Sequence, residues 1–368
     1  MDPTTDRSPA LRPAAGARRA SVAVGLALTS GTTLGLLWFR GQQVPLLGTM
    51  SVGVLAAATT GVVGMWAFVM SYLDGVGARR FRDRPGPRRL VVDTLLLTAA
   101  TVGVAILLIG GVFGVLHHAF REMRLEPVGA ALLGAGAAAV ACASISAVAS
   151  SMTARALSAL LILLATSGVL ASMLSAPDPL WWQRNLSELG AGSDFSAVAF
   201  NATLIATGMA VTALSGYVET DLRNHPGPIA ALSVRVVRTW LIAIGALLAG
   251  VGLVPVSAAD TVHTVIASIM GVGFVALVAA TPFLLPALPR WFHRASVAVV
   301  VAFGAAVLLM WPARYLNLTG VEVVGAGALM AWVVLLARAT TPSTPIRDEG
   351  GAPRPDSRDA ARQVPGIA

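Results

Sequence analysis

An aspartate and a histidine, Asp260 and His263, stand three residues apart where a polar segment gives way to an apolar run. An imidazole beside a carboxylate suits proton transfer, because the imidazole titrates near neutral pH and the carboxylate can hold its orientation. An earlier polar segment carries Glu188. If the chain is an enzyme, we expect a hydrolase or transferase acting on a lipid. His263 would be its general base or a metal ligand, Asp260 would orient His263, and Glu188 would be the acid or a second ligand.

Other polar side chains interrupt the apolar sequence in the same half of the chain. Ionisable groups at membrane depth are costly and often mark a substrate or proton path. We therefore expect one ligand-binding pocket, and its candidate residues are Asn185, Ser187, Glu188, Asn201, His263, Arg314 and Glu322.

Two of these positions also have the spacing of helix caps. In a capping box a side-chain oxygen and a carboxylate satisfy free amides at the start of a helix. Ser257 with Asp260, and Thr319 with Glu322, have this spacing. Capping is thus the structural alternative to a functional role for both carboxylates.

The other candidates have structural alternatives as well. Glu188 follows Arg184 by four residues, which is the spacing of a local ion pair on a helix. His263 would be solvated among lipid head groups, and Asn201 would donate a hydrogen bond to a neighbouring helix. These alternatives leave open whether the polar residues form a site.

Sequence signatures of metals and cofactors are missing from the chain. Its single cysteine, Cys142, excludes an intrachain disulfide and a cysteine-based metal site. There is no HExxH segment, no Walker loop, no GxSxG and no GxGxxG after a strand. We expect no metal and no cofactor, and the sequence supports neither a nucleotide-driven pump nor an ordinary serine hydrolase.

The elements that must position these residues are membrane-spanning helices. With 56% hydrophobic and 12% charged side chains over 368 residues, the chain cannot cover a water-facing surface with polar groups. Apolar runs long enough to cross a hydrocarbon core of about 30 Å recur along it. The fold class is all-α, a polytopic transmembrane bundle of about ten spans, at 21–39, 48–72, 90–116, 128–150, 156–174, 197–217, 237–255, 262–285, 295–311 and 320–337.

The arginines orient these spans. If both termini are cytoplasmic, only five of the 26 basic residues fall on the opposite side, namely Arg40, Arg121, Arg124, Arg184 and Arg314. The net charge of +8 therefore reflects topology, and we expect the lipid bilayer and not nucleic acid as a partner. The predicted location is the cell membrane. The first run could be mistaken for a signal peptide, although it lacks a clear cleavage site.

The chain divides into four predicted parts. Residues 1–20 and 339–368 are Pro- and Arg-rich tails expected to be disordered in the cytoplasm. Residues 21–155 hold four spans, and residues 156–338 hold six. Small residues at helical spacing, Gly31 with Gly35 and Gly110 with Gly114, predict close approach of helix backbones.

The second half resembles a known family, the bacterial polytopic membrane proteins called domain of unknown function 998. The resemblance rests on the segment from Asn185 to Ala191, Phe200 and Asn201, Asp260 with His263, and the segment from Gly320 to Glu322. It covers about residues 156–338. Members usually have a basic residue after the last of these segments, where this chain has Val323. The resemblance implies architecture and leaves the activity open.

Three functions fit the sequence. The first is binding or transport of a lipid or envelope-related molecule through an outward-facing polar pocket. The second is the intramembrane enzyme described above. The third is a scaffold subunit that holds partner proteins through small-residue helix faces, although no motif identifies a protein partner.

Overall fold

The structure of the protein is a computed structural model that describes residues 15–77, 86–120 and 122–341. Its helices are α1 (Ala15–Phe39), α2 (Val52–Gly77), α3 (Pro87–Ala119), α4 (Pro127–Ser150), α5 (Ala154–Ser175), α6 (Phe195–Arg223), α7 (Ala231–Leu253), α8 (Val256–Leu284), α9 (Arg290–Met310) and α10 (Leu318–Thr340). Most of the two predicted tails lies outside the described residues. The predicted N-terminal tail ends within a helix, because α1 begins at Ala15 in an alanine-rich segment that favours helix.

All ten helices of the described ranges are long and apolar enough to cross a membrane. Each predicted span overlaps one of them, so the prediction of a polytopic all-α bundle is confirmed. A helix satisfies its own backbone hydrogen bonds, which the hydrocarbon core requires. The ends are set by local chemistry: Pro87 and Pro127 open α3 and α4, Thr153 caps α5, and Asp194 caps α6.

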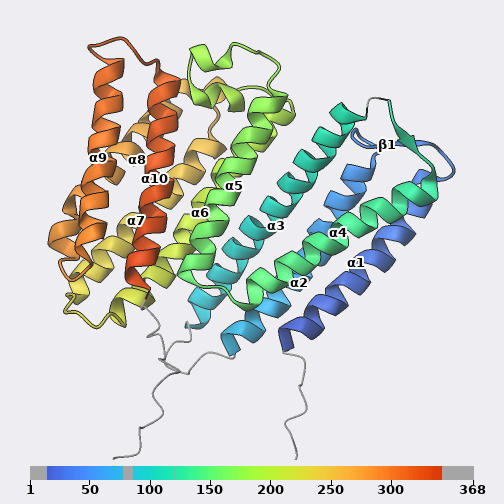
Figure 1. Cartoon of the computed structure of the whole chain (residues 1–368), viewed down its shortest axis with the longest axis horizontal. Coiled ribbons are helices and arrows are strands. Elements are labelled where there is room, and N and C mark those ends of the chain that lie inside the picture. The colour runs from blue at the N-terminus through green and yellow to red at the C-terminus, as the bar shows by residue number, and fades with distance from the viewer. Residues whose placement is uncertain (1–14, 78–85, 121, 342–368) are drawn as a thin grey trace, which may run out of the picture.

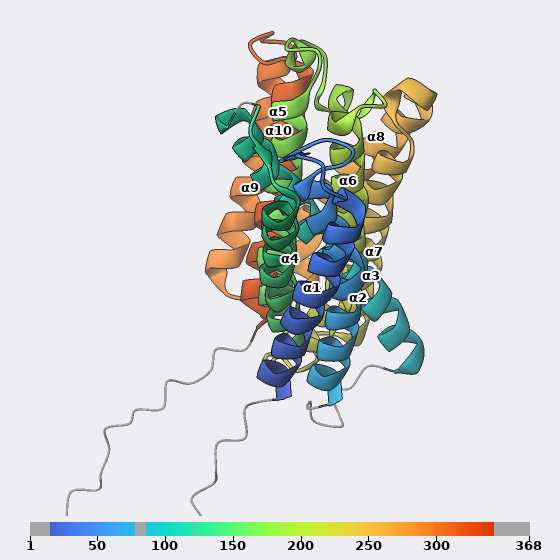
Figure 2. The ribbon, with the colours of Figure 1, turned by 90° about the vertical axis from the view of Figure 1, so that its right-hand side faces the viewer.

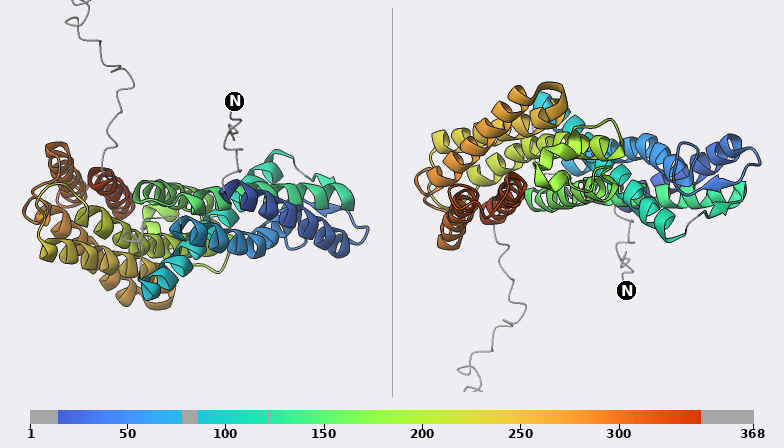
Figure 3. Two further views of the ribbon diagram at one scale, coloured as in Figure 1. Left: turned by 90° about the horizontal axis from the view of Figure 1, so that it is seen from below. Right: turned by 90° about the horizontal axis from the view of Figure 1, so that it is seen from above.

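The helices form two groups that stand side by side (Figure 1). Helices α1 to α4 make one group and α5 to α10 the other, and α3 contacts both α5 and α6. The axes run roughly in one direction (Figure 2), and the bundle seen along them is elongated, with α1 and α8 to α10 at opposite ends (Figure 3). Because α1 begins and α10 ends at the same end of the bundle, we call the other the loop end (Figure 1).

The first group is tied together at the loop end and along its length. Strand β1 (Val44–Pro45), after α1, pairs antiparallel with β2 (Arg124–Leu125), before α4. Along the α1–α4 contact, a Cβ placed on Gly35 would come within 2.7 Å of the Ala131 Cβ, so glycine permits this approach. A Cβ on Gly114 would meet nothing within 4 Å. The predicted close approach is therefore found at Gly35 and not at Gly114, which faces open space.

Buried polar contacts join the two groups and the helices at the other end. The hydroxyls of Tyr72 on α2 and Tyr217 on α6 are 3.0 Å apart and buried. Two residues further along α6, the Glu219 carboxylate, 8% exposed, forms ion pairs with Arg223 and Arg238 at 2.9 Å each and lies 3.8 Å from Arg89. This charge cluster fixes α3, α6 and α7 together at the end where α10 finishes.

Candidate functional site

The loop between α5 and α6, residues 176–194, is ordered by its own side chains. It contains two 3₁₀ turns, η2 (Trp181–Gln183) and η3 (Leu186–Gly190). Arg184 lies between them, with guanidinium nitrogens 2.5 Å from the Asp178 carboxylate and 3.0 Å from the Glu188 carboxylate. The predicted ion pair of Arg184 with Glu188 is confirmed. The loop is thus an ordered segment with its own internal ion pairs at the loop end of the bundle.

Side chains from α6 and α8 hold the second half of this loop. Asn201 donates to the Gly190 carbonyl at 3.0 Å, and a Cβ on Gly190 would lie 2.4 Å from the Asn201 Oδ1. A side chain at position 190 would therefore displace the Asn201 amide that holds this carbonyl. Ser257 donates to the Ala191 carbonyl at 2.5 Å. The predicted capping box of Ser257 with Asp260 is wrong, because α8 starts at Val256 with no side-chain cap.

Two side chains at the start of α10, those of its N-cap residue Asn317 and of Glu322, hold the middle of the loop. Asn317 donates to the Trp182 carbonyl at 2.6 Å, while its Oδ1 accepts from Gly320 N at 3.0 Å and caps the helix. Glu322 accepts the backbone N–H of Leu186. The predicted capping box of Thr319 with Glu322 is wrong for this reason: Asn317 supplies the cap, and the carboxylate reaches across to the loop.

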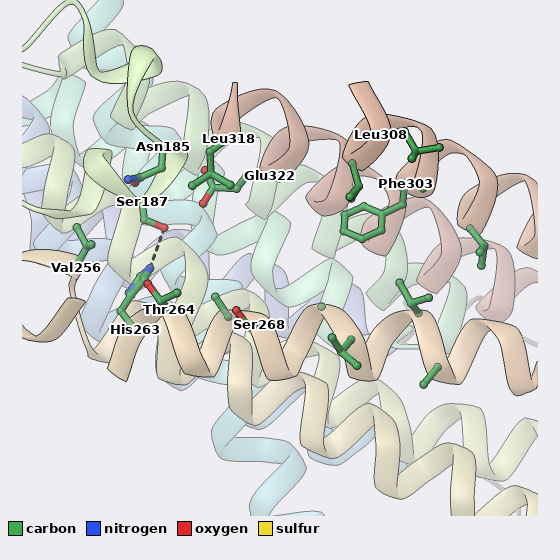
Figure 4. Close-up of a pocket in the computed structure, with 18 of the residues that line it drawn as sticks. Asn185, Ser187, Val256, His263, Thr264, Ser268, Phe303, Leu308, Leu318 and Glu322 are labelled. Atoms are coloured by element: carbon green, nitrogen blue, oxygen red, sulfur yellow. Dashed lines mark hydrogen bonds between the residues drawn. The ribbon is translucent and has the colours of Figure 1, made fainter. Parts of the chain in front are cut away.

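His263 lies where α8 faces this loop. The helix is broken at Ala259 (φ −159°, ψ 78°), and the imidazole turns back so that Nδ1 is 2.7 Å from the Val254 carbonyl oxygen. On the other side of the ring, Nε2 is 2.9 Å from the Ser187 Oγ (Figure 4). His263 is buried, 5% exposed, so the expectation that it is solvated is wrong.

The hydrogen bonds of His263 define its tautomer. A carbonyl oxygen only accepts, so Nδ1 carries the proton, and in the neutral ring Nε2 accepts from the Ser187 hydroxyl. Asp260 does not orient the imidazole, because both ring nitrogens have other partners and the aspartate is exposed. The sequence prediction of an Asp260–His263 pair is wrong. The break at Ala259 makes the local backbone, and not the nearest carboxylate, the partner of Nδ1.

A groove of about 990 Å³ opens beside Ser187 and His263, between α8, α9, α10 and the loop. Polar side chains gather at its loop end, and the groove continues along α8 and α9 between aliphatic residues and Phe303 (Figure 4). The Asn185 Oδ1 is buried without a hydrogen-bond partner among the described residues. The polar lining is Asn185, Ser187, Asp260, His263, Thr264, Ser268 and Glu322.

The structure separates the seven predicted ligand-binding residues. Asn185, Ser187, His263 and Glu322 line the groove. Glu188 lines a neighbouring cavity of about 380 Å³ together with Arg184. Asn201, on α6, holds the loop through the Gly190 carbonyl. Arg314 is exposed in the turn between α9 and α10 and has a φ of 55°. Glu188 thus lines a different cavity from His263 and pairs with Arg184.

Two polar residues of the groove were missed by the sequence reasoning. Thr264 and Ser268 follow Asp260 at intervals of four residues, the spacing of one helix face. That periodicity was a usable signal. Within the described residues there is no group of three or more His, Cys, Asp or Glu side chains that could hold a metal ion.

Comparison with known proteins supports the family resemblance. The family model described as "Protein of unknown function (DUF998)" matches residues 156–339. This range contains nearly all of α5 to α10, with the loop and the groove, and excludes α1 to α4. Neither the curated proteins nor the solved structures gave a match to the chain.

Proposed function

Because this chain belongs to the DUF998 family of proteins of unknown function, the family name supplies no activity, and we propose one from the groove. The protein binds a membrane lipid or a similar envelope amphiphile. The polar head group of the ligand lies at the loop end, and its hydrocarbon chain follows α8 and α9. One observation carries this proposal: the groove lining is polar at the loop end and apolar along α8 and α9.

The size and lining of the groove support an amphiphilic ligand. A volume of about 990 Å³ is at the upper end of the range for small-molecule sites. Small residues such as Gly271 and Gly304 leave room along the apolar part, and a Cβ on either would meet nothing within 4 Å. At the polar end, the unpartnered Asn185 Oδ1 would accept a hydrogen bond from a hydroxyl or ammonium head group.

The position of the groove supports entry from the side. The apolar stretches of α8 and α9 are only 22% and 17% buried within the protein, less than those of the other described helices. A ligand dissolved in the bilayer would reach the groove without crossing water. This arrangement suits an amphiphilic ligand that enters the groove from the bilayer.

We place the loop end on the outer side of the cell membrane, with both termini in the cytoplasm. The support is the bias of arginines toward the segments that would then be cytoplasmic. The charge cluster of Glu219 with its arginines at the opposite end agrees with this orientation. The groove would then bind lipid from the outer leaflet.

The experiment that tests lipid binding is photo-crosslinking in membranes. A phospholipid with a diazirine on its acyl chain is mixed into vesicles with the full-length protein, and crosslinked peptides are mapped by mass spectrometry. We expect adducts on the segments of α8 and α9 that line the groove. Gly271→Phe, which fills the groove, should reduce these adducts several-fold.

The matched control is Gly327→Phe. Gly327 is exposed on α10, a Cβ there also meets nothing within 4 Å, and it does not line the groove. This variant should crosslink as the wild type does. If adducts spread evenly over all lipid-facing helices, or if Gly271→Phe leaves the pattern unchanged, lipid binding in the groove is refuted and the scaffold function takes its place.

A further inference from the structure

We propose that Ser187 is a nucleophile activated by His263, and that the groove is the active site of an esterase that cleaves an acyl ester of its bound lipid. This inference rests on the lipid-binding function proposed above. It assigns a reaction, a nucleophile and a general base to the groove.

Ser187, His263 and the Val254 carbonyl form a chain of hydrogen bonds. The Ser187 Oγ lies 2.9 Å from His263 Nε2, and the Val254 carbonyl holds Nδ1 at 2.7 Å. The carbonyl fixes the tautomer in which Nε2 presents its lone pair to the serine hydroxyl. A nucleophile, a base within hydrogen-bond reach and a third group that orients the base together make the arrangement of nucleophilic catalysis. Here the third group is a backbone carbonyl.

Ser187 and His263 also lie in the groove itself. Both line its polar end, and the apolar part of the groove begins beyond Ser268 on α8 (Figure 4). In an ester lipid the carbonyl lies between the head group and the hydrocarbon chain. A lipid bound with its chain along α8 therefore brings its ester carbonyl to the depth of the serine.

Glu322 supports the serine from α10. Its carboxylate accepts the N–H of Leu186, the residue before the serine, and so holds the η3 turn. We assign Glu322 as a positioning residue that presents Ser187 to His263.

The reaction balances with water as the second substrate. The Ser187 Oγ forms a bond to the acyl carbon while His263 Nε2 takes the hydroxyl proton. The ester C–O bond breaks, and the leaving alcohol receives that proton from His263. Water then attacks the acyl-serine, gives a proton to His263, and releases the fatty acid as Ser187 regains its hydrogen.

The test uses fluorophosphonates, which bond to the oxygen of an activated serine and release fluoride. Membranes that contain the full-length protein are treated with a hexadecyl fluorophosphonate or with a short-chain one, and the adduct is mapped by mass spectrometry. We expect the adduct on Ser187. Ser187→Ala should abolish it, and His263→Ala should slow it about 100-fold or more, the scale of general-base catalysis.

The control is Ser175→Ala at the end of α5. Ser175 is exposed and donates to the Ala171 carbonyl, away from the groove, so this variant should label like the wild type. The wild-type mapping does not depend on the folding of any variant. A serine that only fastens the loop would give no adduct.

The outcomes separate this inference from lipid binding. If lipid crosslinks map to the groove but neither fluorophosphonate labels Ser187 in the wild type, the nucleophile is refuted and lipid binding stands. If both probes label Ser187 equally but lipid crosslinks do not map to the groove, the serine is reactive and the lipid substrate is refuted. Labelling confined to other serines also overturns the assignment.

Discussion

Replacing Glu322 by alanine should loosen the η3 turn of the loop without unfolding the bundle. The Glu322 carboxylate accepts the backbone N–H of Leu186, and alanine leaves that donor without its partner. A hydrogen bond to a charged group contributes about 1.5–3 kcal/mol. Since about 1.4 kcal/mol is a factor of ten in an equilibrium, the open state of this turn should become about 10- to 100-fold more populated.

The change should stay local, because Asn317 and Asn201 still hold the loop at the Trp182 and Gly190 carbonyls. Hydrogen–deuterium exchange read by mass spectrometry measures it. The Leu186 amide should exchange about 10- to 100-fold faster in Glu322→Ala, while the amides of α6 keep their wild-type rates.

Two further variants calibrate this measurement. Glu322→Gln keeps an oxygen acceptor without the charge, and a neutral hydrogen bond contributes about 0.5–1.5 kcal/mol, so its exchange rate should lie between wild type and alanine. Val323→Ala alters the exposed neighbour and should change nothing. An unchanged Leu186 rate in Glu322→Ala would refute the assignment of this carboxylate to the loop.

Two more predictions concern the packing of the bundle. A Cβ on Gly208 would lie 2.3 Å from the Gly245 carbonyl oxygen, so Gly208→Ala should force α6 and α7 apart and cost about 1–3 kcal/mol, seen as a lower melting temperature in detergent; Gly327→Ala, in open space, should not lower it, and equal melting of the two variants would contradict this packing. Glu219→Ala removes the carboxylate that pairs with Arg223 and Arg238 and should cost about 1.5–3 kcal/mol in the same assay, the scale of a hydrogen bond to a charged group, because both arginines stay partly exposed to solvent, whereas a wild-type melting temperature would show that the cluster does not stabilise the fold.

The spans were predictable from the sequence because membrane helices are set by the length and polarity of contiguous segments. The Arg184–Glu188 pair was predictable for a similar reason, since both residues lie in one short segment. The partners of His263 were not predictable. The break at Ala259 brings the Val254 carbonyl to the imidazole, and Ser187 arrives from a loop 76 residues away in sequence. Spacing along one helix carries no information on either contact.

The predicted capping boxes were wrong for the same reason, because the partners of their side chains come from distant parts of the chain. Thr319 and Glu322 have the spacing of a capping box, but Asn317 already satisfies the helix start, which leaves the carboxylate for Leu186. Local patterns describe what a side chain can do at short range. Which partner it takes depends on the loop that the tertiary fold places above it.

The contacts within the first helix group permit it to close before the rest of the chain is made. β1 pairs with β2, and α1 packs on α4, using only residues made before α5. The ribosome adds about 5–20 residues per second, so this group can close roughly 10 s or more before α10 is complete. In that interval the face of α3 that contacts α5 and α6 in the complete structure would be exposed to lipid. The second half would then dock beside a completed group of helices and exchange lipid contacts for helix contacts.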